Sequence, residues 1–441
     1  MIEKYLVKKI TEPVDWKVTV PGSKSMTNRA LLMAVLSAGT VRVEGVLFSD
    51  DSRHFLACLV ALGFTVEIEE EKKCVTVTGC GGRIPREEAV IDVGSAGTAA
   101  RFLAAMLGFS DGCYEIRCSA QMKRRPMAEL FDLLSGAGAK ITFLEEEGHL
   151  PVRITGCRYA RADKTAGETP RELSLDITKS TQFLSALLLI APMVPEGMKI
   201  HITSEKTDGS YIRITRRMMQ EFGVSVAFDG RDYEVPCRSS YRKETYMVEP
   251  DMSAACYFYA AAAVTGGRAL VRHVHMDNTQ GDLRFLEVLE HMGCTADDTP
   301  EGILVTGPAD GALRGITVNM NDFSDQALTL AAIAPFADAP VRIEGIGHIR
   351  GQECDRIHAI QTNLTALGIR CEEEETAATI YPGSPHGGSV ETYDDHRVAM
   401  AFSLVGLRTD GIVIENPACC RKTFENYFTV LSELTGKKME A

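Results

Sequence analysis

The 441-residue sequence has no long apolar run, no surplus of basic residues and no signal-peptide pattern. Its longest apolar stretches cover about a dozen residues, whereas a membrane-spanning helix needs about 20. The formal net charge of −13 argues against a nucleic-acid partner and against binding to a membrane surface. The first residues, "MIEKYLVKKI", lack an apolar segment followed by a small-residue cleavage site. We therefore expect a cytoplasmic protein.

The thirteen cysteines form no metal-binding or disulfide pattern. Their number is odd, they are scattered, and no C-x-x-C occurs anywhere in the chain. Cys419 and Cys420 are the one adjacent pair, and we interpret them as two small, partly buried residues. This usage predicts reduced thiols and no structural metal site.

What the sequence does contain is a repeat. An amphipathic helix that stops at a glycine and passes into a strand recurs, as in "FLACLVALGFTVEI" and "IQTNLTALGIRCE". The stop glycines lie 75, 85, 70 and 75 residues apart, at Gly63, Gly138, Gly223, Gly293 and Gly368. A weaker sixth copy ends at Gly436. Glycine suits these positions because helices commonly end in the left-handed conformation.

A second helix type alternates with the first and is apolar on almost all sides. Its copies are "NRALLMAVLSAG", "AARFLAAMLG", "TQFLSALLLIAP", "SAACYFYAAAAVTGG", "DQALTLAAIAPFA" and "HRVAMAFSLVGL". A helix of this kind must be buried. The pattern predicts six α/β units of about 70 residues, packed as two lobes of three with helices inside and sheets outside. The alternative is accidental periodicity in an ordinary α/β protein.

Polar residues gather where these buried helices begin. In the first half the starts read "PGSKS", "VGSAGT" and "ITKSTQ", which suit phosphate or carboxylate because helix N-termini attract anions. In the second half they read "EPDMS", "NDFSDQ" and "TYDDHR", which carry acids and a histidine. We expect the first half to hold an anionic substrate and the second to supply most of the proton transfer. Each hydroxyl or acid taken alone could be an ordinary helix cap.

Three further features concern basic residues. Arg29 lies four residues after Ser25 on the same helix face, in an otherwise apolar segment, and a buried arginine needs an anionic partner. A basic turn occupies residues 123–125 before Pro126, and a solvated turn would also explain it. In "HIRGQECDRIHAI", residues 352, 353 and 356 fall within one predicted helical turn and so share a face, as they would in a surface salt-bridge helix. The chain has neither a Walker pattern nor a G-x-G-x-x-G after a strand.

Taken in order, several motifs resemble one known family. They are "PGSKSMTNRALLMA", "GSAGTAARFL", "RRPM", "STQFLSALLL", "DMSAACYFYAAA", "SDQALTLA", "RGQECDRI", "DDHRVAMAFSL" and "CRKTFENYF". The chain resembles 5-enolpyruvylshikimate-3-phosphate (EPSP) synthase, or 3-phosphoshikimate 1-carboxyvinyltransferase, over nearly its whole length. The resemblance implies a two-lobed inside-out α/β barrel of βαβαββ units. It places one lobe at residues 21–247 and the other at residues 1–20 plus 248–441.

The resemblance also implies an activity: transfer of the enolpyruvyl group of phosphoenolpyruvate to the 5-hydroxyl of shikimate-3-phosphate. The route would be addition–elimination through a tetrahedral intermediate on the shikimate pathway to aromatic amino acids, by a monomer, with no metal or organic cofactor. The positions implied to hold shikimate-3-phosphate are Lys24, Ser25, Arg29, Ser180, Thr181, Gln182, Asp325 and Gln352. Those implied to hold phosphoenolpyruvate are Lys24, Gly97, Arg125, Gln182, Arg356, Arg397 and Lys422. Asp325 and Glu353 would be the acid–base pair, with His396 beside them and Lys24 or Lys422 assisting.

The sequence departs from the family at a few of these positions. Gln352 stands where the family usually has lysine, Ser95 where many members have asparagine, and Phe102 where they have proline. Which hydroxyl among residues 204, 207 and 210 contacts the substrate phosphate stays open. The family is inhibited by glyphosate at the phosphoenolpyruvate site. Retention of Gly97 predicts sensitivity to it, whereas Phe102 could bring partial tolerance.

Three alternatives differ in testable ways. UDP-N-acetylglucosamine enolpyruvyl transferase shares the fold and donor, but it has a catalytic cysteine that "SAQMKRRP" lacks. Its first helix-start motif also reads A-K-N, where this chain has S-K-S. A non-catalytic relative would keep the fold, and Gln352 is the one argument for it. An RNA-end-processing enzyme of similar architecture is disfavoured by the net charge of −13.

Overall fold

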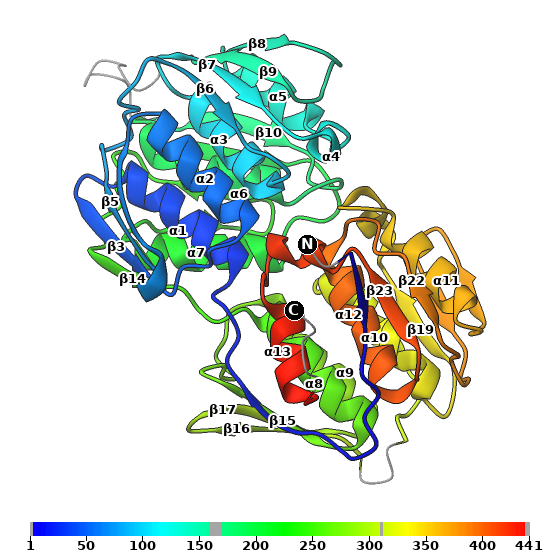
Figure 1. Cartoon of the computed structure of the whole chain (residues 1–441). Helices are drawn as coiled ribbons and strands as arrows, with labels where there is room; N and C mark the ends of the chain where they lie inside the picture. Colours follow the sequence, from blue (N-terminus) through cyan, green and yellow to red (C-terminus); the bar gives the residue numbers. More distant parts are fainter. Residues whose placement is uncertain (1–2, 158–168, 309–311, 437–441) are drawn as a thin grey trace. The chain divides into compact units, whose positions relative to one another are not determined.

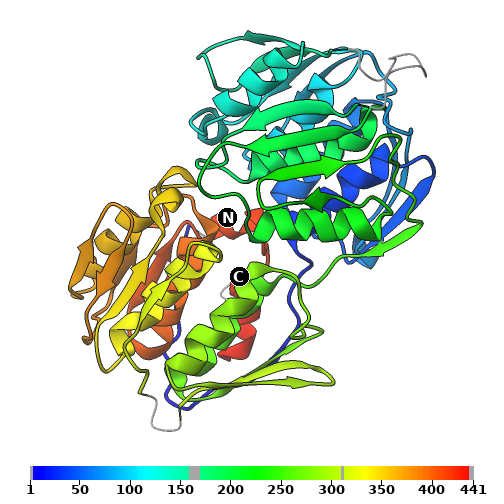
Figure 2. The same cartoon turned by 180° about the vertical axis from the view of Figure 1, so that it is seen from behind.

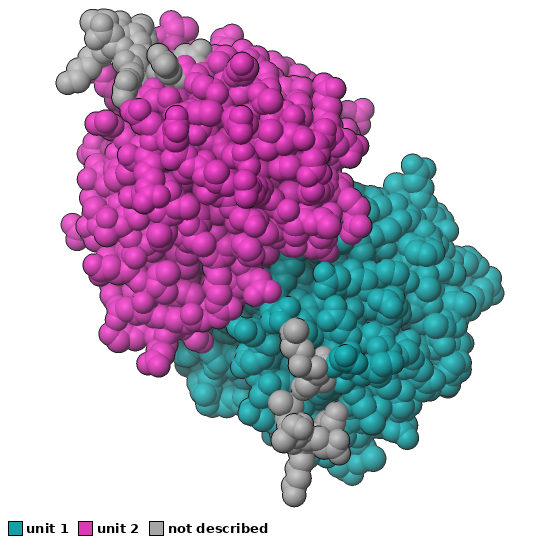
Figure 3. Space-filling view, turned by 45° about the horizontal axis from the view of Figure 1, so that its top comes forward, with its two compact units in different colours: residues 1–21, 250–441 teal, residues 22–249 magenta. Residues whose placement is uncertain are grey.

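The computed structural model describes residues 3–157, 169–308 and 312–436. The chain divides into two compact units, which Figure 3 colours separately. Unit 1 comprises residues 1–21 and 250–441, and unit 2 comprises residues 22–249. Within the described residues, no helix combines the length and the apolar character that crossing a membrane requires.

The described residues of unit 2 form three four-stranded sheets. Their strand orders are β14 (Thr245–Met247), β3 (Thr40–Glu44), β5 (Cys74–Thr78), β4 (Thr65–Glu69); β6 (Glu88–Asp92), β7 (Cys113–Arg117), β9 (Val152–Thr155), β8 (Lys140–Phe143); and β10 (Arg171–Leu175), β11 (Met198–Ile202), β13 (Asp232–Val235), β12 (Ala227–Phe228). In each sheet the first strand runs parallel to the second and the other pairings are antiparallel. One sheet is seen almost face-on, in green, in Figure 2.

Two sets of helices fill and cover unit 2, as Figure 1 shows. The buried set is α1 (Lys24–Leu36), α3 (Gly97–Gly108) and α6 (Gln182–Ile190), whose members pack on one another. The outer set is α2 (Asp50–Ala61), α5 (Ala128–Gly136) and α7 (Ser210–Glu221), with the short α4 (Ala120–Lys123). Every residue of α3 is buried, as the apolar sequence predicts.

Unit 1 repeats the arrangement with one smaller sheet. Its strand orders are β16 (Thr295–Thr299), β17 (Gly302–Thr306), β15 (Arg268–Arg272), β2 (Asp15–Val18); β18 (Thr317–Asn319), β19 (Val341–Glu344), β21 (Ala378–Ile380), β20 (Cys371–Glu373); and β1 (Lys4–Leu6), β23 (Ile412–Glu415), β22 (Gly388–Val390). The buried helices are α8 (Met252–Thr265), α10 (Ala327–Ile333) and α12 (His396–Arg408). The outer helices are α9 (Phe285–His291), α11 (Arg356–Ala366) and α13 (Tyr427–Leu434).

Strand pairing explains why unit 1 is discontinuous in sequence. β2 lies parallel to β15, with Asp15 opposite Arg268, and β1 pairs with β23. At the end of unit 2, β14 takes the same parallel place beside β3. The chain therefore begins in unit 1, builds unit 2, closes its first sheet with β14 and returns.

The predicted helix–glycine–strand repeat is confirmed. All six stop glycines have positive φ, from +61° at Gly436 to +105° at Gly293. Each follows an outer helix by two residues, where the left-handed conformation releases the chain toward the next strand. The predicted α/β class, with buried helices and outer sheets, is likewise confirmed.

Candidate active site

Lys24 begins α1 beside a buried acid. Its Nζ lies 3.4 Å from the Asp51 carboxylate, which is 3% exposed and belongs to the first turn of α2. The Lys24 side chain itself is 18% exposed. Next to it, the hydroxyls of Ser23 and Ser25 lie 3.3 Å apart. The lysine is thus held in place while its ammonium group stays reachable.

The buried helices α8 and α12 of unit 1 begin differently from α10 and from the buried helices of unit 2. In unit 2 the N-cap residues Ser23 and Thr181 make no side-chain hydrogen bond to the helix among the described residues, and α3 is preceded by an alanine. In unit 1, Asp251 accepts hydrogen bonds from the first turn of α8, and Asp395 accepts one from Arg397 N of α12. The starts of α1 and α3 therefore keep backbone donors that no side-chain cap takes up among the described residues, and such donors suit an anion.

Arg29 has no carboxylate partner among the described residues. Its guanidinium donates to Thr215 Oγ1 at 2.8 Å and to Ser25 O at 2.9 Å, and it lies 5.2 Å from the centre of the Phe102 ring. It is 1% exposed, and burial lowers its pKa to about 10. Arg29 is therefore a cation at neutral pH whose charge no acid among the described residues balances.

Gly97, Arg125 and Gln182 meet at the starts of α3 and α6. Arg101, which the sequence analysis missed, donates to Gln182 Oε1 at 2.7 Å and to Gly97 O at 3.4 Å. A Cβ atom on Gly97 would lie 2.7 Å from Arg125 Cζ, closer than van der Waals contact allows. The bare glycine is what lets the Arg125 guanidinium lie against this helix start.

The hydroxyl residues of unit 2 differ in how far they are already engaged. Ser180 Oγ accepts from Gln182 N at 3.3 Å, next to Thr181. Ser204 is buried and its hydroxyl bridges Ile177 N and Lys206 O. Thr207 and Ser210 are partly exposed, which favours them over Ser204 as contacts for a ligand.

In unit 1, Arg356 is the centre of an ion-pair cluster. Its Nε donates to Asp395 at 2.8 Å, its Nη1 to Asp325 at 3.1 Å, and its Nη2 to Glu353 at 3.0 Å. Lys422 Nζ lies 3.3 Å from the other Glu353 oxygen. Burial works to lower the pKa of Arg356, but the carboxylates outweigh it and raise this pKa above its ordinary value. The guanidinium holds the predicted acid–base residues Asp325 and Glu353 on two of its nitrogens.

The prediction that residues 352, 353 and 356 share one helical turn is wrong. α11 begins at Arg356, capped by Asp355, and the residues before it have irregular backbone. Their side chains still converge, because Arg356 donates to Gln352 Oε1 as well as to Glu353. The loop thus brings together the side chains of residues 352, 353 and 356, which the expected helix face would have aligned.

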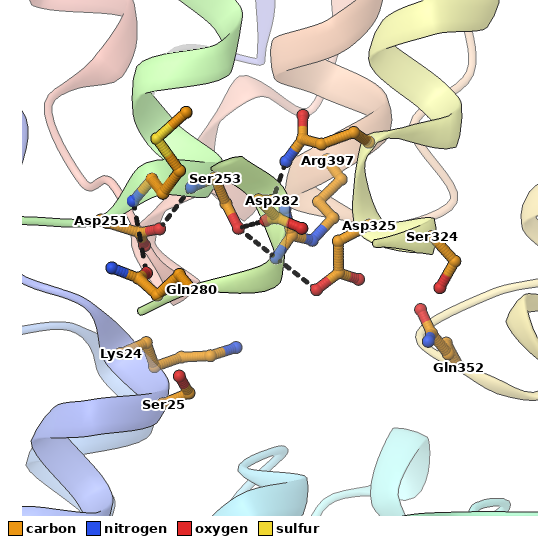
Figure 4. Close-up of polar contacts among 12 residues, drawn as sticks. Lys24, Ser25, Asp251, Ser253, Gln280, Asp282, Ser324, Asp325, Gln352 and Arg397 are labelled. Atoms are coloured by element: carbon orange, nitrogen blue, oxygen red, sulfur yellow. Dashed lines mark hydrogen bonds and ion pairs between the residues drawn. The ribbon is translucent and has the colours of Figure 1, made fainter. Parts of the chain in front are cut away.

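Arg397 links Asp325 to a buried acid, as Figure 4 shows. Its Nη2 donates to Asp325 Oδ2 at 2.9 Å and to Ser253 Oγ at 3.3 Å. The Ser253 hydroxyl in turn donates to Asp282, which is 6% exposed. Burial, and then the nearby Asp325 charge, raise the pKa of Asp282 to about 6.

His396 is buried behind this cluster. It is 1% exposed, and its Nδ1 lies 3.6 Å from Asp395 Oδ1. The Cys420 thiol donates to its backbone carbonyl. This position favours a role in orienting the Asp395 carboxylate, and through it the Arg356 guanidinium, over direct contact with a ligand.

Four buried residues of the two clusters escaped the sequence analysis as individuals: Asp51, Arg101, Asp282 and Asp395. The three acids each follow a glycine or another acid at an ordinary helix start, a pattern that surface caps also show. The available signal was charge in an apolar setting, as at Arg101 in "AARFLAAMLG".

A sequence model of the family described as EPSP synthase (3-phosphoshikimate 1-carboxyvinyltransferase) matches residues 8–431. The chain belongs to the EPSP synthase family. A protein of Trichormus variabilis named 3-phosphoshikimate 1-carboxyvinyltransferase is 41% identical over 97% of this chain and 98% of its own. A protein of the same name from Sulfurovum is 39% identical over 96% of this chain and 97% of its own.

Solved structures agree with the family fold. EPSP synthase from Acinetobacter baumannii superposes with a TM-score of 0.79 at 25% identity, covering 99% of both chains. The enolpyruvyl transferase NikO from Streptomyces tendae superposes with a TM-score of 0.72 at 17% identity, covering 98% of this chain and 97% of that one. The predicted enolpyruvyl transferase fold is confirmed. Membership of the EPSP synthase family disfavours UDP-N-acetylglucosamine enolpyruvyl transferase and a non-catalytic relative.

Proposed function

We propose that the chain transfers the enolpyruvyl group of phosphoenolpyruvate to the 5-hydroxyl of shikimate-3-phosphate and releases phosphate. The observation that carries this proposal is its likeness, over 97% of its length, to proteins named 3-phosphoshikimate 1-carboxyvinyltransferase. The unit 2 helix starts and the Arg356 cluster of unit 1 support it, because both hold groups that this chemistry needs.

Shikimate-3-phosphate is held mainly by unit 2 in this proposal. Ser25, Ser180, Thr181 and Gln182 offer hydroxyl and amide groups at the starts of α1 and α6, whose N-cap residues make no side-chain cap among the described residues. Arg29 supplies positive charge that no protein carboxylate balances among the described residues. In unit 1, Gln352 gives its amide oxygen to Arg356, which leaves its amide nitrogen to donate to a substrate hydroxyl.

Phosphoenolpyruvate carries a carboxylate and a phosphate, which require several cations. Arg125 beside Gly97 supplies one in unit 2, and Lys24 is close to the start of the same group of helices. Arg356, Arg397 and Lys422 supply three in unit 1, where carboxylates hold each of them in position. Guanidinium groups fixed in this way can bind carboxylate or phosphate without rearranging during the reaction.

The chemistry needs a base and an acid. Asp325 accepts the proton of the 5-hydroxyl while the hydroxyl oxygen forms a bond to C2 of phosphoenolpyruvate. Glu353 gives a proton to the methylene carbon. The tetrahedral intermediate then loses a methyl proton and its C2–O bond to phosphate breaks, which regenerates the enol ether. Lys422, 3.3 Å from Glu353, and Lys24 can assist these transfers and balance the charge of the departing phosphate.

A phosphate-release assay tests this function. We expect release only when shikimate-3-phosphate and phosphoenolpyruvate are both present, and loss of it in Asp325→Asn. UDP-N-acetylglucosamine in place of shikimate-3-phosphate should give none. Release with either substrate alone, or with the sugar nucleotide as acceptor, would reject the proposal.

We infer that the protein works in the cytoplasm as a monomer. All thirteen cysteines are free thiols, which a reducing compartment preserves. Light scattering of the purified protein checks the second point: a mass near 48.1 kDa is expected, and twice that mass would contradict it.

A further inference from the structure

Asp282 is a buried acid that the proposed reaction does not use. It lies in the 3₁₀ turn η4 (Gly281–Arg284), and its Oδ2 accepts hydrogen bonds from two side chains. One is the Ser253 hydroxyl at the start of α8, and the other is Gln326 Nε2 at 3.0 Å. A carboxylate buried this far is costly unless its neighbours repay the lost hydration.

The two donors lead to the same residue from opposite sides. Gln326 follows Asp325 in the turn η5 (Ser324–Gln326), so Asp282 anchors the backbone that carries Asp325. The Gln326 amide has one orientation, since its oxygen accepts from Thr329 Oγ1 at 2.9 Å. The Ser253 hydroxyl meets Arg397, which donates to Asp325. Asp282 therefore contacts the residue that follows Asp325 directly. It reaches Arg397, the partner of Asp325, through Ser253 (Figure 4).

The direction of the hydrogen bonds depends on Asp282. A hydroxyl has a single hydrogen, and Ser253 gives it to Asp282. Its lone pairs are then free to accept from Arg397 Nη2 at 3.3 Å. Without an acceptor at position 282, the Ser253 hydrogen could turn toward the guanidinium and weaken that contact.

From this geometry we propose that Asp282 is a positioning residue, which fixes Asp325 through Gln326 and Arg397 through Ser253, and that its negative charge is required for turnover. The proposal rests on the proposed function, in which Asp325 is the base. The charged or titratable groups that face Asp282 are Asp325 of η5, Arg397 of α12 and the Cys256 thiol of α8, which donates to the Asp282 carbonyl.

Asp282→Asn tests the charge, because asparagine keeps the size and can still accept from Ser253. Wild-type phosphate release must first require both substrates, which establishes the reaction, and each variant is then compared with wild type. We expect kcat to fall about 100-fold, as for small misplacements of catalytic groups, and the KM for shikimate-3-phosphate to change much less. A wild-type kcat in Asp282→Asn would overturn the proposal.

The pH dependence separates this role from a merely structural one. Substrate ionisations are common to both proteins, so the ratio of wild-type to Asp282→Asn kcat isolates the Asp282 charge. That ratio should be large at pH 8 and fall toward one as the pH drops below about 6, where Asp282 takes up a proton. A ratio that does not change with pH would contradict the requirement for charge.

Ser253→Ala tests the link to Arg397 without touching a charge. We expect roughly tenfold lower kcat, as for one lost hydrogen bond, and a melting temperature a few degrees lower, because Asp282 keeps only its Gln326 donor. Ser403→Ala is the matched control, because Ser403 is also a buried hydroxyl in unit 1, bonded to Met400 O and Tyr427 outside this network. Equal activity of the two serine variants would exclude the Ser253 link.

Discussion

At the scale of single residues, burial decides which of the proposed ligand-binding cations can be removed without disturbing the fold. Lys24 is 18% exposed and bound to one acid, whereas Arg356 is 1% exposed and bound to three. Removing Arg356 would take a partner from the buried Asp395 and from the partly buried Asp325 and Glu353, so its loss would mix folding and activity. Lys24 allows a cleaner experiment.

Lys24→Met should lower kcat by at least about 10³-fold, because a cation that meets developing charge is lost. Its melting temperature should stay within about 2 °C of wild type, as for an ordinary surface change. Asp51 loses its lysine, but it lies in the first turn of α2, where the helix end stabilises a carboxylate.

Lys199→Met is the matched control for Lys24→Met. Lys199 is also paired with an acid, Asp232 at 3.0 Å, but it lies on the exposed strand face of β11. The activity of Lys199→Met should equal that of wild type. A large drop in melting temperature with modest loss of kcat in Lys24→Met would instead show that Lys24 is structural.

The raised pKa of Asp282 has a consequence for stability. In the unfolded chain this pKa is 3.8, and in the folded protein it is about 6, so the folded state binds the proton more tightly. Between these values the free energy of unfolding therefore falls as pH rises. Asp282→Asn has no carboxyl group to titrate at this position. Its free energy of unfolding, relative to that of wild type, should therefore rise by as much as about 3 kcal/mol between pH 3 and pH 7.

Urea unfolding of both proteins at several pH values measures this difference. The comparison across pH removes the constant cost of the altered hydrogen bonds. A difference that stays the same from pH 3 to pH 7 would show that Asp282 ionises at its ordinary pKa.

At the scale of elements, most of the fold could be predicted because it depends on periodicity. Apolar faces and stop glycines are local signals, and the six outer helices end two residues before the predicted glycines. The loop before α11 could not be predicted, because the spacing in "GQECDR" fits a helix as well as it fits three side chains converging on one guanidinium. The network at Asp282 joins residues from four separated segments, and no local pattern encodes such contacts.

The start of α3 offers the prediction at this scale. Gly97→Ala should displace the guanidiniums of Arg125 and Arg101, since a Cβ would lie 2.7 Å from Arg125 Cζ and 2.9 Å from Arg101 Nη1. Glyphosate is longer than phosphoenolpyruvate and should lose more binding. We expect its inhibition constant to rise roughly 10- to 200-fold, as for one methylene group in a fitted pocket, and the KM for phosphoenolpyruvate to rise less.

Inhibition kinetics with phosphoenolpyruvate as the varied substrate check this prediction. Gly136→Ala in α5 is the control, because a Cβ there meets no atom within 4 Å. Phe102 is fully buried with Arg29 over its ring, so it acts on α3 from the side away from solvent. If glyphosate does not inhibit the wild-type enzyme even at concentrations far above the KM for phosphoenolpyruvate, Ser95 and Phe102 become the residues to exchange.

At the scale of the whole molecule, the proposed roles are divided between two compact units. Unit 2 carries Lys24, Gly97 and Arg125, and unit 1 carries the Arg356 cluster. The chain passes between the units twice, near residues 21 and 250. We expect two connections to permit hinged motion of the units, and under the proposed function a substrate that binds residues of both would restrict it.

Small-angle scattering tests this consequence of the proposed function. Saturating shikimate-3-phosphate should lower the radius of gyration of the wild-type protein, because one ligand then bridges Ser25 or Arg29 of unit 2 and Asp325 of unit 1. Shikimate without its phosphate, at the same concentration, should lower it less, since the group that the unit 2 helix starts bind is missing. Calorimetry on the same samples establishes that the ligand is bound. Binding with an unchanged radius would mean that shikimate-3-phosphate is held by one unit alone, and the shikimate contacts assigned to Asp325 and Gln352 would then be withdrawn.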